Sequence, residues 1–126
     1  MRNFAVGDEF IHERTFSDAD VIAFLAISED RGRHHDIPGP DGRRLVHGLL
    51  TATIPTKIGG DLDYLAREMR FEFLRPVYTG DTIRCVVTVE EVDARPDRTR
   101  LVLRGICRDQ TGAEVMRFFT RGVVRA

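Results

Sequence analysis

The residues best suited to chemistry in this sequence lie in one short polar segment, SEDRGRHHD at residues 28–36. It places Asp30 a few residues before two adjacent histidines, His34 and His35. Carboxylate and imidazole groups can move protons in catalysis, and both also bind metal ions. The segment therefore has three interpretations: a catalytic loop, a metal site, or a solvated turn that happens to be charged.

A metal site built from His34, His35 and Asp36 is the least supported of these interpretations. Side chains of adjacent residues in an extended loop point apart, so three in a row rarely reach one ion. The sequence has no HExxH pattern, and Cys85 and Cys107 form neither a CxxC pair nor a Cys/His zinc spacing. We therefore expect neither a metal nor another cofactor.

A predicted helix precedes this segment and must position it. Ser17 and Asp20 have the spacing of a capping box, which predicts a helix that begins after Ser17 and runs toward residue 28. Residues 31–46, in contrast, are rich in glycine and proline and predict an irregular loop. The buried face of the helix is expected to consist of Val21, Phe24, Leu25 and Ser28, widened by Ile22 and Ile27.

A second helix is predicted over residues 47–60, HGLLTATIPTKIGG, which are largely apolar and end in two glycines. Apolar residues on all sides of a helix indicate that it is buried. Pro55 lies inside this helix and should bend it, because proline removes one backbone hydrogen bond.

The rest of the chain is strand-like, and residues 8–16 could add an edge strand. Consecutive strands joined by turns form an antiparallel sheet, so the sequence predicts one α+β domain over residues 1–126, with a long helix buried against the sheet. Uncovered sheet edges favour a homodimer or a higher homo-oligomer. Period-two alternation of apolar residues predicts four strands, within 65–77, 82–92, 98–108 and 114–126.

Composition excludes several classes of partner. The net charge of −1 provides no strong positive field for nucleic acid or for a membrane surface. No apolar run approaches the roughly 20 residues needed to span a bilayer, and the N-terminal residues show no signal peptide. Cys85 and Cys107 lie in strand-like runs and are expected to be buried, reduced thiols. Together these features predict a soluble, cytoplasmic protein.

The order of several sequence blocks resembles a known family. FSDADVIAFLAISED, a histidine, VHGLLTA and MRFEFLRPVYTGDTI follow one another as they do in the MaoC-like dehydratase family, which includes the (R)-specific enoyl-CoA hydratases. The resemblance extends from about Phe4 to Val124. It implies the hot-dog fold, in which a curved antiparallel sheet wraps around a long helix.

The motif of that family implies roles for individual residues. Its catalytic Asp and His fall on Asp30 and His35 with the family spacing, and its oxyanion-hole amide falls on Gly48. The Asn and Pro of the motif are replaced here by Gly32 and Arg33. The segment between His35 and VHG is also shorter than in typical hydratases of the family.

The resemblance also implies positions that contact substrate. A family Ser falls on Thr56, whose hydroxyl could instead bond back to a helix carbonyl. Arg33 and the other arginines of residues 31–44 are suited to the phosphates of coenzyme A, although solvated loop charges explain them equally well. His47 begins the second helix, where it could contact substrate or tie the loop down.

As a whole, the resemblance implies a hydro-lyase that reversibly hydrates trans-2-enoyl-CoA, or the matching thioester of an acyl carrier protein, to the (R)-3-hydroxyacyl thioester. One alternative is a non-catalytic hot-dog subunit or acyl-CoA-binding module. Another is a thioesterase, a class that shares the fold but not this set of motifs.

Overall fold

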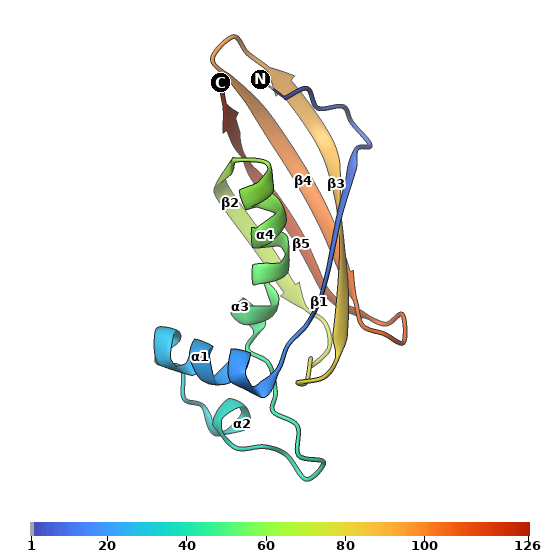
Figure 1. Cartoon of the computed structure of the whole chain (residues 1–126). Helices are drawn as coiled ribbons and strands as arrows, with labels where there is room; N and C mark the ends of the chain where they lie inside the picture. The colour runs from blue at the N-terminus through green and yellow to red at the C-terminus, as the bar shows by residue number, and fades with distance from the viewer. Residues whose placement is uncertain (1) are drawn as a thin grey trace.

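The computed structural model describes residues 2–126 (Figure 1). One curved sheet forms a layer, α4 lies along its inner face, and α1 and α2 lie together at one end (Figure 1). The α+β class predicted from the sequence is confirmed. The elements follow the chain as β1 (Glu9–Thr15), α1 (Asp18–Ser28), α2 (Arg33–Asp36), α3 (Gly48–Thr51), α4 (Thr53–Asp61), β2 (Tyr64–Phe73), β3 (Thr82–Ala94), β4 (Arg98–Arg108) and β5 (Glu114–Arg125).

All five strands belong to one antiparallel sheet in the order β1-β3-β4-β5-β2. The four predicted strands and the predicted edge strand are all present. β4 shows the period-two pattern clearly. Leu101, Leu103 and Cys107 are buried, and each neighbouring residue along the strand is more exposed. This alternation arises because the face of the sheet that carries these residues packs into the core.

The two cysteines lie opposite each other in the centre of the sheet, Cys85 on β3 and Cys107 on β4. Both are fully buried free thiols, as predicted. A hydrogen bond with the neighbouring thiol, together with burial, raises the pKa of Cys85 far above its usual range. The thiol of Cys85 therefore stays protonated and packs as part of the hydrophobic core.

The helix predicted over residues 47–60 is present, but it is neither continuous nor buried on all sides. The helix is interrupted at Ala52, which separates the single turn of α3 from α4. Pro55 explains the break, because it has no N–H for the carbonyl of Thr51 and its ring crowds that carbonyl. α4 is also buried on one side only: Ile54 and Ile58 face the core, whereas Lys57 is exposed. Within residues 2–126, no helix is long and apolar enough to cross a membrane.

α1 begins with the predicted capping box. The Ser17 hydroxyl accepts the Asp20 N–H at 3.2 Å, and the Asp20 carboxylate accepts the Ser17 N–H at 2.9 Å. Val21 and Leu25 are buried as expected, but Ile22 and Ile27 are exposed, so the buried face is narrower than predicted. The helix is short and lies at the end of the sheet, where it can bury only one narrow stripe (Figure 1).

Candidate functional site

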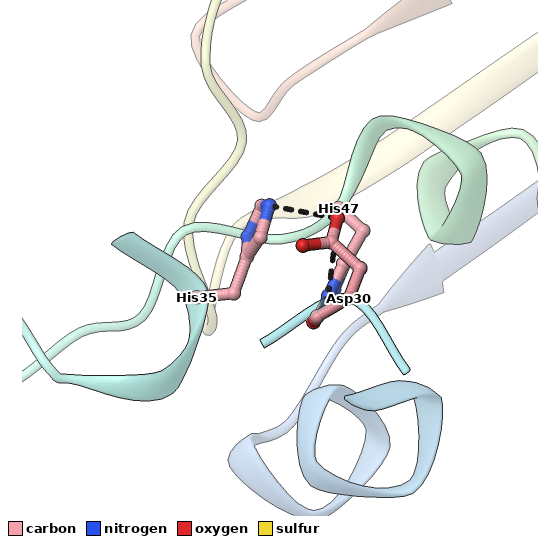
Figure 2. A group of neighbouring side chains, drawn as sticks. All are labelled: Asp30, His35 and His47. Atoms are coloured by element: carbon pink, nitrogen blue, oxygen red, sulfur yellow. Dashed lines mark hydrogen bonds and ion pairs between the residues drawn. The ribbon is translucent and has the colours of Figure 1, made fainter. Parts of the chain in front are cut away.

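Three side chains from separate parts of the chain converge at the end of the sheet where α1 and α2 lie (Figure 2). Asp30 follows α1, His35 belongs to α2, and His47 is the residue that precedes α3. One Asp30 carboxylate oxygen, Oδ2, lies 3.8 Å from Nε2 of His35 and 4.0 Å from Nε2 of His47. The predicted pair Asp30 and His35 is thus brought together, with a second imidazole beside it.

Local hydrogen bonds hold the Asp30 carboxylate in place. Glu29 ends α1 in the left-handed conformation, with φ of 60°, and so turns the chain toward the site. The Asp30 N–H then donates to the Ser28 hydroxyl at 3.0 Å, and Asp30 Oδ1 accepts the Gly32 N–H at 3.1 Å. This last bond, followed by the nearby His35 and His47, keeps the pKa of Asp30 below its ordinary value. Asp30 is therefore an ionised carboxylate at neutral pH.

The imidazole of His35 is buried and has a defined orientation. Its Nδ1 lies 2.7 Å from the carbonyl oxygen of Leu45. A carbonyl only accepts hydrogen bonds, so in the neutral ring Nδ1 holds the proton and Nε2 keeps its lone pair. That lone pair is on the nitrogen nearest to Asp30, so the pair can bind and deprotonate one small molecule such as water.

The imidazole of His47 packs against one face of the His35 ring. The two rings stack, with centroids 3.7 Å apart and planes at 15°, and the edge of Phe24 packs against His47. Nε2 of His47 lies 3.0 Å from the backbone oxygen of Asp30, so it donates its proton there. Its other nitrogen, Nδ1, is buried without a hydrogen-bond partner in the described chain. His47 thus ties the loop that contains Asp30 to the start of α3, one of the two roles considered from the sequence.

The same three residues are the group that could best hold a metal ion, since their ligand atoms lie within 4.8 Å of one another. Two features argue against it. Stacked rings direct their in-plane lone pairs side by side rather than toward one point. In addition, the His47 nitrogen nearest Asp30 already donates to a carbonyl. The set differs from His34, His35 and Asp36, which we had considered from the sequence.

A cavity of about 630 Å³ opens beside these groups and is lined by Asp30, His35, His47 and Gly48. Gly48 is the first residue of α3, and helix geometry leaves its N–H without an intrahelical acceptor. A Cβ at this position would lie 2.8 Å from the Phe73 ring, so any larger residue would require that ring to move. Much of the remaining lining is apolar, and its larger side chains include Phe24, Leu49, Phe73 and Leu74.

Two residues predicted to contact substrate lie outside that cavity. Thr56 lines a separate cavity of about 140 Å³ between α4 and the sheet, and its hydroxyl donates to the Ala52 carbonyl at 3.0 Å. Arg33 is exposed at the start of α2. A larger cavity of about 820 Å³ lies on the part of the sheet around Val92, Leu101 and Val123 and contains none of the predicted site residues.

Sequence reasoning missed the aromatic side chains that shape the site. Phe24 packs against the core as expected, but its ring also contacts His47 and lines the cavity, which the helical pattern did not indicate. Phe73 was recognised only as part of an alternating strand, and its contact with Gly48 depends on how β2 meets α3. Phe73 is separated from Gly48 by 25 positions along the chain, so no local pattern could have indicated this contact.

No protein-family model matches this chain, and no curated protein matches it. Solved structures do. An (R)-hydratase from A. caviae involved in PHA biosynthesis is 26% identical, with a TM-score of 0.85 and 100% of both chains covered. R-hydratase PhaJ1 from Pseudomonas aeruginosa is 21% identical, with a TM-score of 0.79 over 97% of this chain and 82% of that chain.

A MaoC-like dehydratase from Rhodospirillum rubrum is 22% identical, with a TM-score of 0.77 over 97% of this chain and 93% of that chain. These likenesses confirm the resemblance that the sequence blocks indicated. The chain therefore has the hot-dog fold, and the solved structures that it resembles include (R)-hydratases and MaoC-like dehydratases.

Proposed function

We propose that this protein is a hydro-lyase that adds water reversibly to trans-2-enoyl thioesters and forms (R)-3-hydroxyacyl thioesters. The observation that carries the proposal is the pair Asp30 and His35, an ionised carboxylate and an imidazole whose facing atoms are 3.8 Å apart beside a cavity. The full-length likeness to the A. caviae (R)-hydratase supports the same activity.

In this proposal Asp30 and His35 bind one water between them. As the water oxygen bonds to the β-carbon, one of the two groups takes its proton, and a proton is delivered to the α-carbon. The reverse sequence removes water. The Gly48 N–H stabilises the negative charge that develops on the thioester oxygen, because it is a free donor at the start of a helix. Asp30, His35 and Gly48 are thus the proposed catalytic residues.

Coenzyme A or an acyl carrier protein would present the thioester at the mouth of the 630 Å³ cavity. His47, which lines this cavity, is proposed to contact substrate as well as to hold the loop. Arg33 is exposed next to the site and is suited to a phosphate of the carrier. Thr56 would act from the smaller cavity under α4, with its hydroxyl redirected from Ala52 toward the acyl chain.

The assay that tests the proposal follows the loss of enoyl absorbance with crotonyl-CoA and longer enoyl-CoAs. Asp30→Asn and His35→Ala should each lower kcat/KM by about 100-fold or more, because each removes a proton-transfer group. His34→Ala is the matched control: its ring contacts His35 but does not line the cavity, so its effect should be much smaller.

Thermal unfolding of the same variants separates chemistry from folding: all three should unfold cooperatively, and their losses of stability should not follow their losses of activity. If the unmodified protein binds acyl-CoA but does not hydrate it, the non-catalytic binding module is correct. Release of free coenzyme A would instead indicate a thioesterase. Equal losses for His34→Ala and His35→Ala would show that the motif has been placed one residue out of register.

A further inference from the structure

A buried carboxylate, Asp81, lies just before β3, outside the lining of the candidate site's cavity. Its exposed fraction is 7%. It accepts three hydrogen bonds: the Tyr78 N–H at 2.8 Å on Oδ2, and Arg43 Nη1 at 3.2 Å and Gln110 Nε2 at 2.9 Å on Oδ1. A buried carboxylate is costly unless it is paired and hydrogen-bonded, so these partners fix Asp81. Asp81 in turn holds Nη1 of Arg43, whose Nε donates to the exposed Asp41 at 2.8 Å.

Arg43 is the first residue of a short segment, residues 43–46, that we call the strap. The strap runs antiparallel to residues 77–79. The Arg44 N–H donates to the Thr79 hydroxyl at 3.1 Å, and its carbonyl accepts the Thr79 N–H at 2.9 Å. One further backbone bond, from the Val46 N–H to the Val77 carbonyl at 2.8 Å, completes the pairing.

The strap contains the group that orients His35. Leu45, its third residue, pairs with Tyr78 as an isolated bridge, and its carbonyl accepts the proton on His35 Nδ1. On the N-terminal side, the strap is preceded by residues 37–42, all of which are exposed and which are rich in glycine and proline. The pairing with residues 77–79 is too short to be rigid alone. The ion pair between Arg43 and Asp81 adds an anchor at the N-terminal end of the strap, while an ion pair between Arg44 and Asp18 and a bond from the Leu45 N–H to the His34 carbonyl add others.

We propose that Asp81 is a positioning residue for His35. Through Arg43 it holds the Leu45 carbonyl where it fixes the proton of His35 on Nδ1, and it thereby leaves the Nε2 lone pair facing Asp30. The catalytic consequence rests on the proposed hydratase function. The effect on the His35 tautomer does not, because it follows from the hydrogen bonds alone.

The first test is the side-chain ¹⁵N NMR spectrum of His35 in the Arg43→Met and Asp81→Asn variants. The unmodified protein should show His35 with its proton on Nδ1. Both variants should show a mixture of the two neutral tautomers, because the Leu45 carbonyl is no longer held. Arg43→Lys keeps a cation for Asp81 and should restore most of the original signal.

Arg117→Met is the control, because it removes an arginine of similar exposure and its ion pair with Glu114 on the outside of the sheet. It should leave the His35 signal unchanged. Loss of the Asp81 anchor should also lower kcat for enoyl-CoA hydration by about 10- to 100-fold with little change in KM, since small displacements of a catalytic group are costly. Arg117→Met should not do so.

A lower melting temperature in Arg43→Met and Asp81→Asn with an unchanged His35 signal would overturn the proposal and leave Asp81 a purely structural residue. The two proposals fail separately. An unmodified protein without hydratase activity would refute the proposed function, whereas a tautomer shift in the variants would still establish the positioning role.

Discussion

The Asp30 carboxylate depends on a backbone donor more than on its histidine neighbours. The Gly32 N–H is the largest influence that lowers its pKa, with His35 and His47 behind it. A carboxyl whose pKa is lower in the folded protein stabilises the fold above its ordinary pKa, and this contribution disappears as the pH falls through the lowered value. The folded protein should therefore keep Asp30 ionised well into the acid range.

We predict that a ¹³C titration of the Asp30 carboxyl will have its midpoint below the ordinary value of 3.8. In His35→Ala the midpoint should rise but stay below 3.8, because the Gly32 bond remains. The stability advantage over Asp30→Asn, measured by urea unfolding, should be larger at neutral pH than in strong acid. A midpoint above 3.8 in the unmodified protein would contradict this account.

Glu29 has a left-handed backbone, which costs a residue with a side chain about 1 kcal/mol and costs glycine little. We predict that Glu29→Gly raises the free energy of unfolding by about 0.5–1 kcal/mol. Ala23→Gly, an exposed position inside α1, is the control and should lower it by about 1 kcal/mol. Chemical denaturation measures both, and a destabilised Glu29→Gly would show that the Glu29 side chain makes a compensating contact.

The resemblance to a family predicted part of the site. It implied that Asp30, His35 and Gly48 converge, and all three line one cavity; their spacing along the chain alone does not show this. The stacking of His47 on His35 could not be predicted, since it requires residues 35 and 47 to meet after an irregular loop. The bond between His35 and the Leu45 carbonyl could not be predicted either. Every residue has a carbonyl group, and only the folded strap brings this one next to His35.

At the level of elements, α2 is a single turn whose first position would accept proline, the residue found there in the family motif. Arg33 is its first residue, and the preceding Gly32 is extended, with φ of −50° and ψ of 136°. Proline is favoured at a first helical position, and an extended residue before it is compatible with its ring. The backbone at position 33 is therefore compatible with proline, although the chain has arginine there.

We predict that Arg33→Pro stabilises the protein by about 0.4–1 kcal/mol, because proline restricts the unfolded chain at a position that it fits. Asp36→Pro should destabilise it, because the Asp36 N–H donates to the Gly32 carbonyl at 3.0 Å. Differential scanning calorimetry distinguishes the two. A destabilised Arg33→Pro would indicate that the Arg33 side chain itself supports α2.

Elements were easier to predict than their ends. The four long strands, β2 to β5, were expected because alternation over ten or more residues is a strong signal, whereas the seven-residue β1 was indicated only weakly. The bend expected at Pro55 became a break at Ala52, one turn earlier, because proline affects the carbonyl of the preceding turn. Ile22 and Ile27 fit a helical pattern but are exposed, and periodicity alone does not reveal how wide a face the neighbouring sheet can cover.

The whole molecule has two free sheet edges, β1 and β2, and they differ in character. Three large apolar residues on β2 have about half of their surface exposed: Leu65, Met69 and Phe73. On β1, one large apolar residue, Ile11, is exposed to the same degree. An apolar, unpaired edge is suited to association with a second copy. We therefore propose that the protein forms a homodimer and that β2 is its interface.

We predict a particle of twice the 14.3 kDa chain mass by light scattering at micromolar concentration. Leu65→Arg should produce monomers, because it places a charge on the proposed contact. Ile11→Arg, the matched change on the opposite edge, should leave the dimer intact. If Ile11→Arg alone dissociates it, the interface is β1, and a monomeric unmodified protein would refute the dimer.

The exposed residues 37–42 connect α2 to the strap, and contacts outside this stretch hold the two together: His35 Nδ1 lies 2.7 Å from the Leu45 carbonyl oxygen, and the Leu45 N–H donates to the His34 carbonyl at 3.3 Å. Lengthening such a connection costs little, since each doubling of a flexible loop adds only about 0.6 kcal/mol of closure entropy. This stretch is thus where insertions can accumulate without displacing His35 or Leu45. Evolution, or an engineer, can add an entire substrate-covering lobe at this position while the reacting groups keep their geometry.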